Sequence, residues 1–381
     1  MRNFVFHNPT KYVFGKDTVK KIGEEIASFD SKKVLLVAGG GSIKKNGVYD
    51  TVVDSLKKHG IQWVELWGVR PNPVLSKVRE GIEIAKKENV DGVLAVGGGS
   101  VIDTAKTIAH GLFIDNVWDM FVDSSKVPDS ALPIYVVLTI SATGSEMNGG
   151  AVITNEETGQ KWAFSSPLSY PKVSIVDPTV QFSLPKKQTA NGGSDALSHI
   201  LEAYITGKST DTTVYYDEGL MRSIIDNIDT LMVDPRNYEA RASFAWAATL
   251  ALNGISSKGL AGDWLSHAIE HAISAIYPDV AHGSGLAVVH PAVLMYRRKH
   301  NPEILKRWAQ QVWGENTIEG GIERLRAKYK EWGLPISLKE LGVKPSDWQS
   351  IIDKTVELGW GDLWEPITPQ VVEEILRYAD I

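Results

Sequence analysis

A carboxylate and an imidazole stand one helical turn apart in the second half of the chain. Asp195 and His199 occupy positions i and i+4 within the segment Asn191–His199, and Ser194 is a candidate N-cap for a helix that begins there. Side chains at this spacing share one face of a helix, so both can reach the same ligand. The pair therefore predicts one half of a metal site.

A second pair with the same spacing lies further along the chain. His267 and His271 fall in an apolar helical segment that runs through Ile276. The turn Tyr277–Asp279, which contains a proline, is expected to end this helix. His282 is then expected in a loop, from which it can fold back toward His267.

One carboxylate and three imidazoles make a ligand set for a divalent metal. The four candidates are Asp195, His199, His267 and His282. Such a set suits Fe(II), Zn(II), Ni(II) or Co(II), and the sequence does not distinguish among them. The chain has no cysteine, which excludes thiolate ligands and thiolate nucleophiles. A single histidine is usually a hydrogen-bonded structural residue, but four of the nine histidines fall in these two clusters, which favours a metal site.

The segment His267–His271 also fits the pattern H-x-x-E-H of inverted zinc metalloproteases. In that alternative both histidines bind zinc and Glu270 activates a water for peptide cleavage. Five-residue patterns arise often by chance, and this one leaves Asp195 and His199 unexplained.

Two triple-glycine segments follow directly on strand-like runs in the first half of the chain. They consist of Gly39, Gly40, Gly41 and Ser42 after the first run and of Gly97, Gly98, Gly99 and Ser100 after the second. Glycines let a backbone turn tightly and approach a ligand closely, and the N–H groups at the start of a following helix favour an anion. The two loops together predict a site for the pyrophosphate of a dinucleotide.

Neither loop has the G-x-G-x-x-G pattern, because Lys44 and Ile102 stand where the third glycine belongs. A tight strand-to-helix turn is the simpler explanation for one such loop alone. The second loop continues through Asp103 to Lys106, which places a carboxylate and a cation close to the glycines. Two loops with this polar surrounding favour cofactor binding.

The first loop indicates which dinucleotide it binds. No acidic residue follows the glycines to accept the ribose 2′-hydroxyl, whereas Ser42, Lys44 and Lys45 can hold a 2′-phosphate. The sequence thus favours NADP(H), with NAD(H) as the alternative.

The elements that must position these residues change in character midway along the chain. Short apolar runs predict buried parallel strands at Lys33–Ala38, 61–66, Gly92–Val96, 133–138 and Val173–Val176, with crossover helices at Val48–Lys58 and 74–87. Beyond residue 178 only helical patterns remain. We expect an α/β dinucleotide-binding domain with a parallel sheet over residues 1–184 and an all-α metal-binding and substrate domain over residues 185–381.

Composition narrows the class of partner. The chain has 381 residues and a hydrophobic content of 43%, which is typical of a globular protein. Its net charge of −6 gives no overall positive electrostatic field that would attract the phosphate backbone of a nucleic acid. No run approaches the ~20 apolar residues of a membrane span. The segment 1–15 has no continuous apolar run after a charged start, so it does not have the pattern of a signal peptide. A cytoplasmic protein is expected.

These segments together resemble the iron-dependent alcohol dehydrogenases, in particular their butanol dehydrogenase-like branch, over essentially the whole chain. The resemblance is carried by 39–47, 97–103, 138–148 and the pairs Asp195/His199 and His267/His282. It implies an N-terminal domain similar to dehydroquinate synthase, a helical C-terminal domain and a homodimer, with Phe4–Phe14 similar to the N-terminal strands of the family.

The resemblance also implies roles for individual residues. Asp195, His199, His267 and His282 would bind the metal, with His271 as a nearby proton relay. Thr139, Thr143 and Lys161 would contact the cofactor, in addition to the glycine loops, Ser42, Lys45, Ser100 and Asp103. The expected reaction transfers a hydride between NADP(H) and a small alcohol or aldehyde, with Trp162, Trp264 and Tyr277 as candidate walls for the substrate.

Two further alternatives stay open at this point. A lyase of the dehydroquinate synthase type binds NAD and zinc within a related fold, but the several Arg and Lys residues that its acidic substrate needs are scarce in the second half of this chain. A nucleotide-binding protein without catalytic activity has no positive feature in the sequence.

Overall fold

The computed structural model describes residues 1–381, and the chain divides into two compact units. One unit contains His7–Leu184 and Pro235–Ala245, and we call it the sheet unit. The other contains Met1–Phe6, Pro185–Asp234 and Trp246–Ile381, and we call it the helical unit. The predicted order of an α/β part followed by an all-α part is confirmed.

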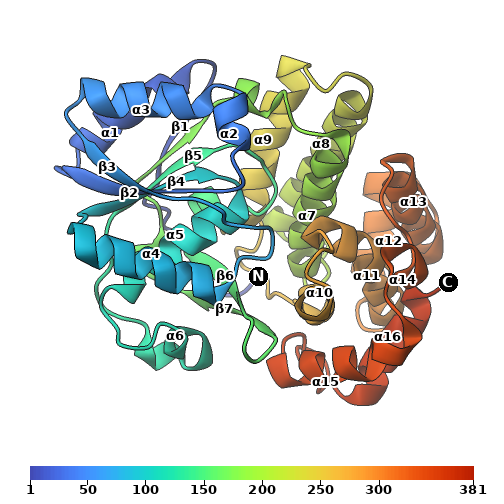
Figure 1. Ribbon diagram of the computed structural model, residues 1–381. Coiled ribbons are helices and arrows are strands. Elements are labelled where there is room, and N and C mark those ends of the chain that lie inside the picture. Colours follow the sequence, from blue (N-terminus) through green and yellow to red (C-terminus); the bar gives the residue numbers. More distant parts are fainter. The chain divides into compact units, whose positions relative to one another are not determined.

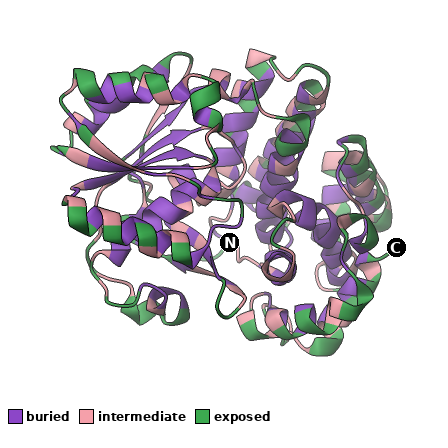
Figure 2. Ribbon diagram, in the orientation of Figure 1, coloured by how far each residue is buried: buried purple, intermediate pink, exposed green.

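The sheet unit is built on six parallel strands. They are β1 (Lys11–Phe14), β2 (Lys33–Ala38), β3 (Gln62–Leu66), β4 (Gly92–Gly97), β5 (Ile134–Leu138) and β8 (Val173–Val176), in the spatial order β1-β8-β5-β4-β2-β3. Strands β2, β4, β5 and β8 are buried almost throughout because helices cover both faces of the sheet (Figure 2).

Each face of this sheet has its own core. Alternate residues of β2 point to opposite faces, so Val34 and Leu36 pack under one layer while Leu35 and Val37 pack under the other. The helices of the sheet unit are α1 (Ile22–Ala27), α2 (Ser42–Lys45), α3 (Val48–Lys58), α4 (Leu75–Glu88), α5 (Gly99–Gly111) and α6 (Asp119–Val122). Helices α1 and α3 cover one face, and α4 and α5 cover the other (Figure 1).

The strand order brings the two glycine loops together. Strand β4 pairs with β2 on one side and with β5 on the other. At the carboxyl ends of the strands, Val96 of β4 lies opposite Ala38 of β2, and Gly97 of β4 lies opposite Leu138 of β5. The carboxyl ends of these three neighbouring strands therefore release their loops at one edge of the sheet. That edge is the usual ligand-binding position in open α/β sheets.

The helical unit is organised around two long buried helices, α7 and α11. Its helices are α7 (Lys186–Tyr204), α8 (Thr212–Val233), the second half of α9 (Tyr238–Leu252), α10 (Leu265–Ile276), α11 (His282–Arg297), α12 (Pro302–Trp308), α13 (Ile318–Glu331), α14 (Leu338–Leu341), α15 (Trp348–Leu358) and α16 (Pro369–Ala379). Gly283 lies against the backbone of Asn191, where a Cβ would collide, so α7 and α11 approach closely at this point. This close approach positions the residues of the candidate site.

Several elements differ from the sequence prediction. The antiparallel hairpin of β6 (Gly150–Asn155) and β7 (Gln160–Ser165) was not predicted. Helix α7 begins after Pro185 rather than at Ser194, so Ser194 is a buried residue inside the helix and the N-cap prediction is wrong. His282 opens α11 instead of lying in a loop. None of the helices is long and apolar enough to span a membrane.

Candidate functional site

Four side chains of the helical unit converge on one point. Oδ1 of Asp195 lies 3.4 Å from Nε2 of His199, 3.8 Å from Nε2 of His267 and 3.6 Å from Nε2 of His282. Ligand bonds of about 2.1 Å in a tetrahedral site separate neighbouring ligand atoms by about 3.4 Å. Asp195, His267 and His282 offer ligand atoms within 4.8 Å of one another, which fits a single bound divalent ion. His199 approaches this group through Asp195 but does not share the mutual spacing of the other three.

Two of the four ligand atoms are buried and have no hydrogen-bond partner within the protein. Oδ1 of Asp195 and Nε2 of His267 are buried without a hydrogen bond. Asp195, His199 and His267 are almost fully buried, whereas the side chain of His282 is 24% exposed. Polar atoms left unpaired in an interior are costly, so their clustering indicates a place for a cation. The cluster opens toward solvent at His282.

The protonation states of Asp195 and His199 suit metal binding. Burial raises the pKa of Asp195, but the neighbouring histidines outweigh it and lower this pKa to about 2. Burial lowers the pKa of His199 to about 4, which leaves the ring neutral. His267 differs, since burial lowers its pKa but Glu202 and Asp195 raise it to about 10. A proton and a metal ion compete for Nε2 of His267.

Two glutamates that the sequence did not assign to the site hold two of these rings. Glu202 accepts a hydrogen bond from Nδ1 of His267, and its other oxygen accepts from the backbone N–H groups of Ser266 and His267. Glu270 accepts from Nδ1 of His282 and from the hydroxyl of Ser274. Each carboxylate fixes the tautomer that leaves Nε2 free for a metal. Glu202 lies seven residues after Asp195, on the same face of α7, which was the available signal.

Glu270 therefore does not occupy the position that a protease mechanism needs. Its side chain is fully buried, and both oxygens are engaged by His282 and Ser274. Activation of a water for peptide cleavage requires a carboxylate that faces the water. The glutamate of the H-x-x-E-H match, Glu270, therefore orients the ring of His282 instead of activating a water.

His271 lies beside the cluster without belonging to the four. Its ring centroid is 5.6 Å from that of His282 and 6.3 Å from that of His267. Glu270, His271 and His282 also offer ligand atoms within 4.8 Å of one another, but Glu270 is already committed to His282. A neighbouring position suits a group that moves a proton.

The candidate cofactor residues of the sheet unit gather at the edge where β2, β4 and β5 end. Gly39–Ser42 follows β2, Gly97–Ser100 follows β4, and Thr139 follows β5 with its N–H bonded to the carbonyl of Gly97. Lys161 is buried and donates to the side chain of Asn72 at 2.9 Å. Asn72 was not predicted, and its backbone is left-handed (φ 52°), a conformation that asparagine adopts more readily than most residues.

The two glycine loops differ in how much room they leave. In the second loop a Cβ at Gly97, Gly98 or Gly99 would collide with Val101, Ile140 or Thr143, respectively. These three glycines are thus needed for local packing, as a tight turn requires. In the first loop a Cβ at Gly40 or Gly41 would meet nothing, although Gly41 has φ 97°. Gly40 is exposed and open to a ligand.

Asp103 and Lys106 support the neighbouring loop from beneath. Asp103 accepts from the hydroxyl of Ser145 at 2.6 Å and from the N–H of Val152 at 3.0 Å. Lys106 donates to Ser145 and to backbone carbonyls of Asn148 and Gly150. Burial lowers the pKa of Lys106 to about 8 against the opposing charge of Asp103. Both side chains are occupied in fixing residues 143–152.

The three candidate wall residues lie in different surroundings. Trp264 packs on the cluster, with ring centroids 5.3 Å from His267 and 6.3 Å from His199. Trp162 instead stacks on Trp118 inside the sheet unit. Tyr277 donates to Asp347.

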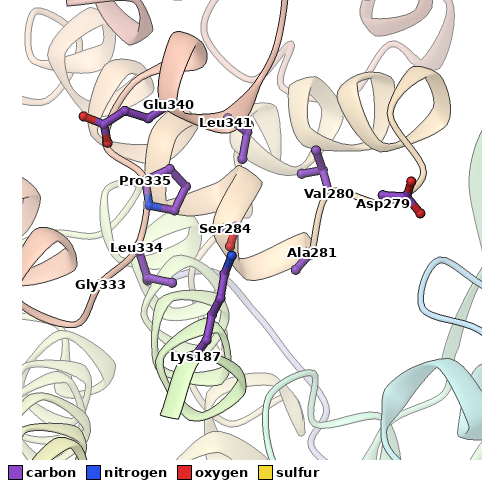
Figure 3. A pocket seen from close by; sticks show the side chains of 10 residues that line it. All are labelled: Lys187, Asp279, Val280, Ala281, Ser284, Gly333, Leu334, Pro335, Glu340 and Leu341. Carbon is purple, nitrogen blue, oxygen red and sulfur yellow. The ribbon is translucent and has the colours of Figure 1, made fainter. Parts of the chain in front are cut away.

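A pocket of about 380 Å³ lies next to the start of α11 in the helical unit (Figure 3). It is lined by Lys187, Asp279, Val280, Ala281, Ser284, Gly333, Leu334, Pro335, Glu340 and Leu341. The side chain of Lys187 extends toward Ser284 at the start of α11, and the hydroxyl of Ser284 donates to Asn191. None of the four metal-ligand candidates lines this pocket.

Comparison with known proteins identifies the family of this chain. The model of the iron-containing alcohol dehydrogenases matches residues 9–178, and that of the C-terminal domain of the Fe-containing alcohol dehydrogenase family matches residues 189–379. The chain belongs to the iron-containing alcohol dehydrogenase family. It is an NAD(P)-dependent oxidoreductase that acts as an alcohol dehydrogenase or aldehyde reductase, and its family uses a metal. The protease, the lyase and the catalytically silent protein are thereby set aside.

Individual family members are similar over nearly their whole length. A probable NADH-dependent butanol dehydrogenase 1 of Bacillus subtilis is 41% identical, over 99% of both chains. The NADPH-dependent aldehyde reductase YqhD of Escherichia coli is 35% identical over 100% of both. The crystal structure of NADH-dependent butanol dehydrogenase A from Thermotoga maritima has a TM-score of 0.96 at 50% identity, over 100% of this chain and 99% of that one.

Proposed function

We propose that this family member uses one divalent ion, held by Asp195, His199, His267 and His282, to reduce small aldehydes to alcohols with NADPH. The observation that carries the proposal is the approach of one carboxylate oxygen to three Nε2 atoms within 3.8 Å. Fe(II) is the proposed ion, and the same donors accept Zn(II), Ni(II) or Co(II). When bound, a divalent ion polarises a carbonyl and lowers the pKa of an alcohol.

The residues around the ligands have separate tasks in this proposal. Glu202 and Glu270 hold the rings of His267 and His282 in the orientation described above. His271, which is 97% buried, moves the proton between the substrate oxygen and solvent. Burial of Asp195, His199 and His267 keeps bulk water away from these three side chains, which strengthens their electrostatic interactions.

The proposed cofactor site uses the three loops at one edge of the sheet. Its candidates are Gly39, Gly40, Gly41, Ser42, Lys45, Gly97, Gly98, Gly99, Ser100, Asp103, Thr139, Thr143 and Lys161. The N-terminus of α5, which opens at Gly99, offers backbone N–H groups to a pyrophosphate. Asp103 contributes by holding Ser145 and Val152, because its carboxylate is already engaged.

A preference for NADP(H) over NAD(H) is part of the proposal. The carboxylate of Glu65 on the neighbouring strand β3 accepts hydrogen bonds from Tyr49, Trp63 and Trp67. It is therefore not free to accept a hydrogen bond from a ribose 2′-hydroxyl in place of the acidic residue that the first loop lacks. Lys44 lies over the ring of Trp67 at 4.0 Å, and Lys45 is exposed. The relatives carry both kinds of name, NADH-dependent and NADPH-dependent, so the preference needs a direct measurement.

We also propose that the protein is a cytoplasmic homodimer. The N-terminal segment exposes apolar side chains, with Phe4 52%, Val5 86% and Phe6 45% exposed, and clusters of this kind usually mark an interface. Consumption of a reduced dinucleotide requires a compartment that maintains one, such as the cytoplasm. Light scattering after gel filtration distinguishes a dimer from a monomer.

Anaerobic purification followed by metal analysis and an aldehyde panel tests the proposed function. We expect one transition-metal ion per chain and reduction of short aldehydes with a higher kcat/KM for NADPH than for NADH. Equal turnover after complete metal removal would refute the metal role, and a preference for NADH would refute the choice of coenzyme.

A further inference from the structure

Two tryptophans lie against the histidine cluster of the helical unit. Trp264 packs on His267 and His199, as described above. Trp360 lies 96 residues after Trp264 in the chain, and its ring centroid lies 5.3 Å from that of His271. Both indoles are half-buried, so each presents one face to the site and another to its surroundings.

The backbone of Trp264 has an unfavourable conformation that places its ring. Its φ is 59°, in the left-handed region that non-glycine residues avoid for steric reasons. Gly262 lies so close to the indole of Trp264 that a Cβ there would collide with it. Such strain persists where the surrounding structure enforces it, and it is concentrated at functional sites.

Trp360 is presented by a similarly unusual turn. It stands between Gly359 (φ 71°) and Gly361 (φ 96°), both of which need the freedom of glycine. A Cβ on Gly361 would collide with Leu265, the residue that follows Trp264. The turn that carries Trp360 therefore packs directly on the start of α10.

One buried guanidinium ties both tryptophan-bearing segments together. Arg297 makes two hydrogen bonds to the carboxylate of Asp263, at 3.0 and 3.1 Å, and a third to the carbonyl of Gly361. Asp263 immediately precedes Trp264, and Gly361 immediately follows Trp360. The side chains of Arg297 and Asp263 are completely buried.

The loop after Trp360 is anchored by the same guanidinium. Arg297 contacts the carboxylate of Glu365 at 3.1 Å, and the hydroxyl of Tyr296 donates to it at 2.7 Å. Trp364 stacks on His300 with the ring planes 25° apart. The segment that presents Trp360 is thus held at both ends.

We propose that Trp264 and Trp360 form the apolar wall for the hydrocarbon chain of the substrate, and that Trp360 limits the length of this chain. The proposal rests on the proposed function. The cluster is accessible at His282, which neighbours His271, and Trp360 packs on His271. A substrate whose oxygen reaches the cluster from this side extends its carbon chain along Trp360. Arg297 acts as a positioning residue for both rings.

The test compares unbranched aldehydes of three to ten carbons with the metal-loaded enzyme. For the wild type, kcat/KM should rise several-fold per methylene and then fall once the chain meets Trp360. In Trp360→Ala the maximum should move to longer chains, with at least a tenfold gain for octanal relative to butanal. Trp360→Phe should give an intermediate profile, and the metal content should stay the same.

A matched control and a second variant separate wall formation from general damage. Trp313→Ala removes a half-buried indole that packs on Trp308, away from the histidines, and should leave the chain-length profile unchanged. Arg297→Lys keeps the positive charge but loses the two parallel hydrogen bonds to Asp263. It should shift the preferred chain length in the same direction as Trp360→Ala, and the change should appear in KM more than in kcat.

The outcomes distinguish this inference from the proposed function. An active wild type with the same chain-length profile in Trp360→Ala would overturn the wall while leaving the proposed function intact. Absence of aldehyde reduction in the metal-loaded wild type with either coenzyme would overturn both.

Discussion

The carboxylate of Glu202 bridges the side chain of His267 and the backbone at the start of α10. One oxygen accepts from Nδ1 of the ring, and the other accepts from the N–H groups of Ser266 and His267 at 2.9 and 3.2 Å. A single residue of α7 thereby fixes both the helix and the ring that it carries. The orientation of His267 is set before any ion binds.

Replacement of Glu202 by glutamine should weaken metal binding. The amide has nearly the same shape, but it loses the negative charge that makes Nδ1 of His267 a donor and Nε2 a stronger ligand. Partners of this kind typically contribute 10–100-fold to metal affinity. Competition with a chromogenic chelator under anaerobic conditions measures the change.

Glu218→Gln provides the control for Glu202→Gln. Glu218 is equally buried in the helical unit, but it accepts from Tyr204 and Arg307 rather than from a histidine of the cluster. This variant should lose stability and keep its metal affinity. Equal metal affinity in both variants would show that Glu202 does not orient His267.

Alanine at His267 and at His271 should separate ligand from proton relay. His267→Ala removes one of three nitrogen ligands, so metal content and activity should both be lost while the dinucleotide still binds. His271→Ala should retain the metal and reduce turnover, because only the proton path is interrupted. Metal analysis, coenzyme binding by fluorescence and kcat are measured on the same samples. Equal loss of metal in the two variants would contradict the assignment.

The sequence predicted which candidate ligands share one helix, but it did not predict how closely ligands from different helices approach one another. The i, i+4 spacing of Asp195 and His199 is a property of one helix. By contrast, the approach of His282 to Asp195 depends on the close packing of α11 on α7 at Gly283. The sequence grouped these residues by their chemistry as a metal-ligand set and by the family resemblance, but neither supplied the distances between them.

The errors in the predicted elements have the same origin. The sequence analysis placed an N-cap at Ser194, and the residues before it, Asn191, Gly192 and Gly193, are poor helix formers. In the structure Gly193 packs against Ile228 and Trp332, where a Cβ would not fit, and α7 continues through it. Tertiary packing overrode the local preference.

Glu270 shows a different limit of sequence interpretation. The motif H-x-x-E-H placed Glu270 close to metal-binding histidines, and the structure agrees. The motif also indicates that this glutamate activates a water, whereas in the structure its carboxylate accepts from Nδ1 of His282. Trp360 carried no sequence signal because it lies 89 residues after His271 along the chain. Only the fold brings the two rings within 5.3 Å.

Gly40→Asp should reverse the proposed coenzyme preference. The position is open to solvent and tolerates a Cβ, so the aspartate should fit without disturbing the loop. Its charge repels a 2′-phosphate and can accept from a 2′-hydroxyl. We expect kcat/KM for NADPH to fall at least tenfold and that for NADH to hold or rise. Gly40→Asn has the same size without the charge, so a comparable loss of NADPH activity in both variants would point to a steric effect instead.

His110 should make the protein less stable at mildly acidic pH. The ring is fully buried in the sheet unit, where Nε2 lies 2.9 Å from the hydroxyl of Ser169, and burial lowers its pKa from 6.5 to about 4. Between these two values the unfolded chain binds a proton that the folded state excludes. Folding stability is therefore unaffected above pH 6.5 and decreases as the pH falls toward 4, by up to about 3 kcal/mol.

His110→Gln should remove this part of the pH dependence. The glutamine amide can still reach Ser169 but does not titrate, so the drop in melting temperature between pH 7.5 and pH 5 should be smaller than in the wild type. His7→Gln, at an exposed position, should reproduce the wild-type drop. An identical drop in His110→Gln and wild type would show that His110 is not excluded from protonation in the folded protein, and that the acid sensitivity arises elsewhere.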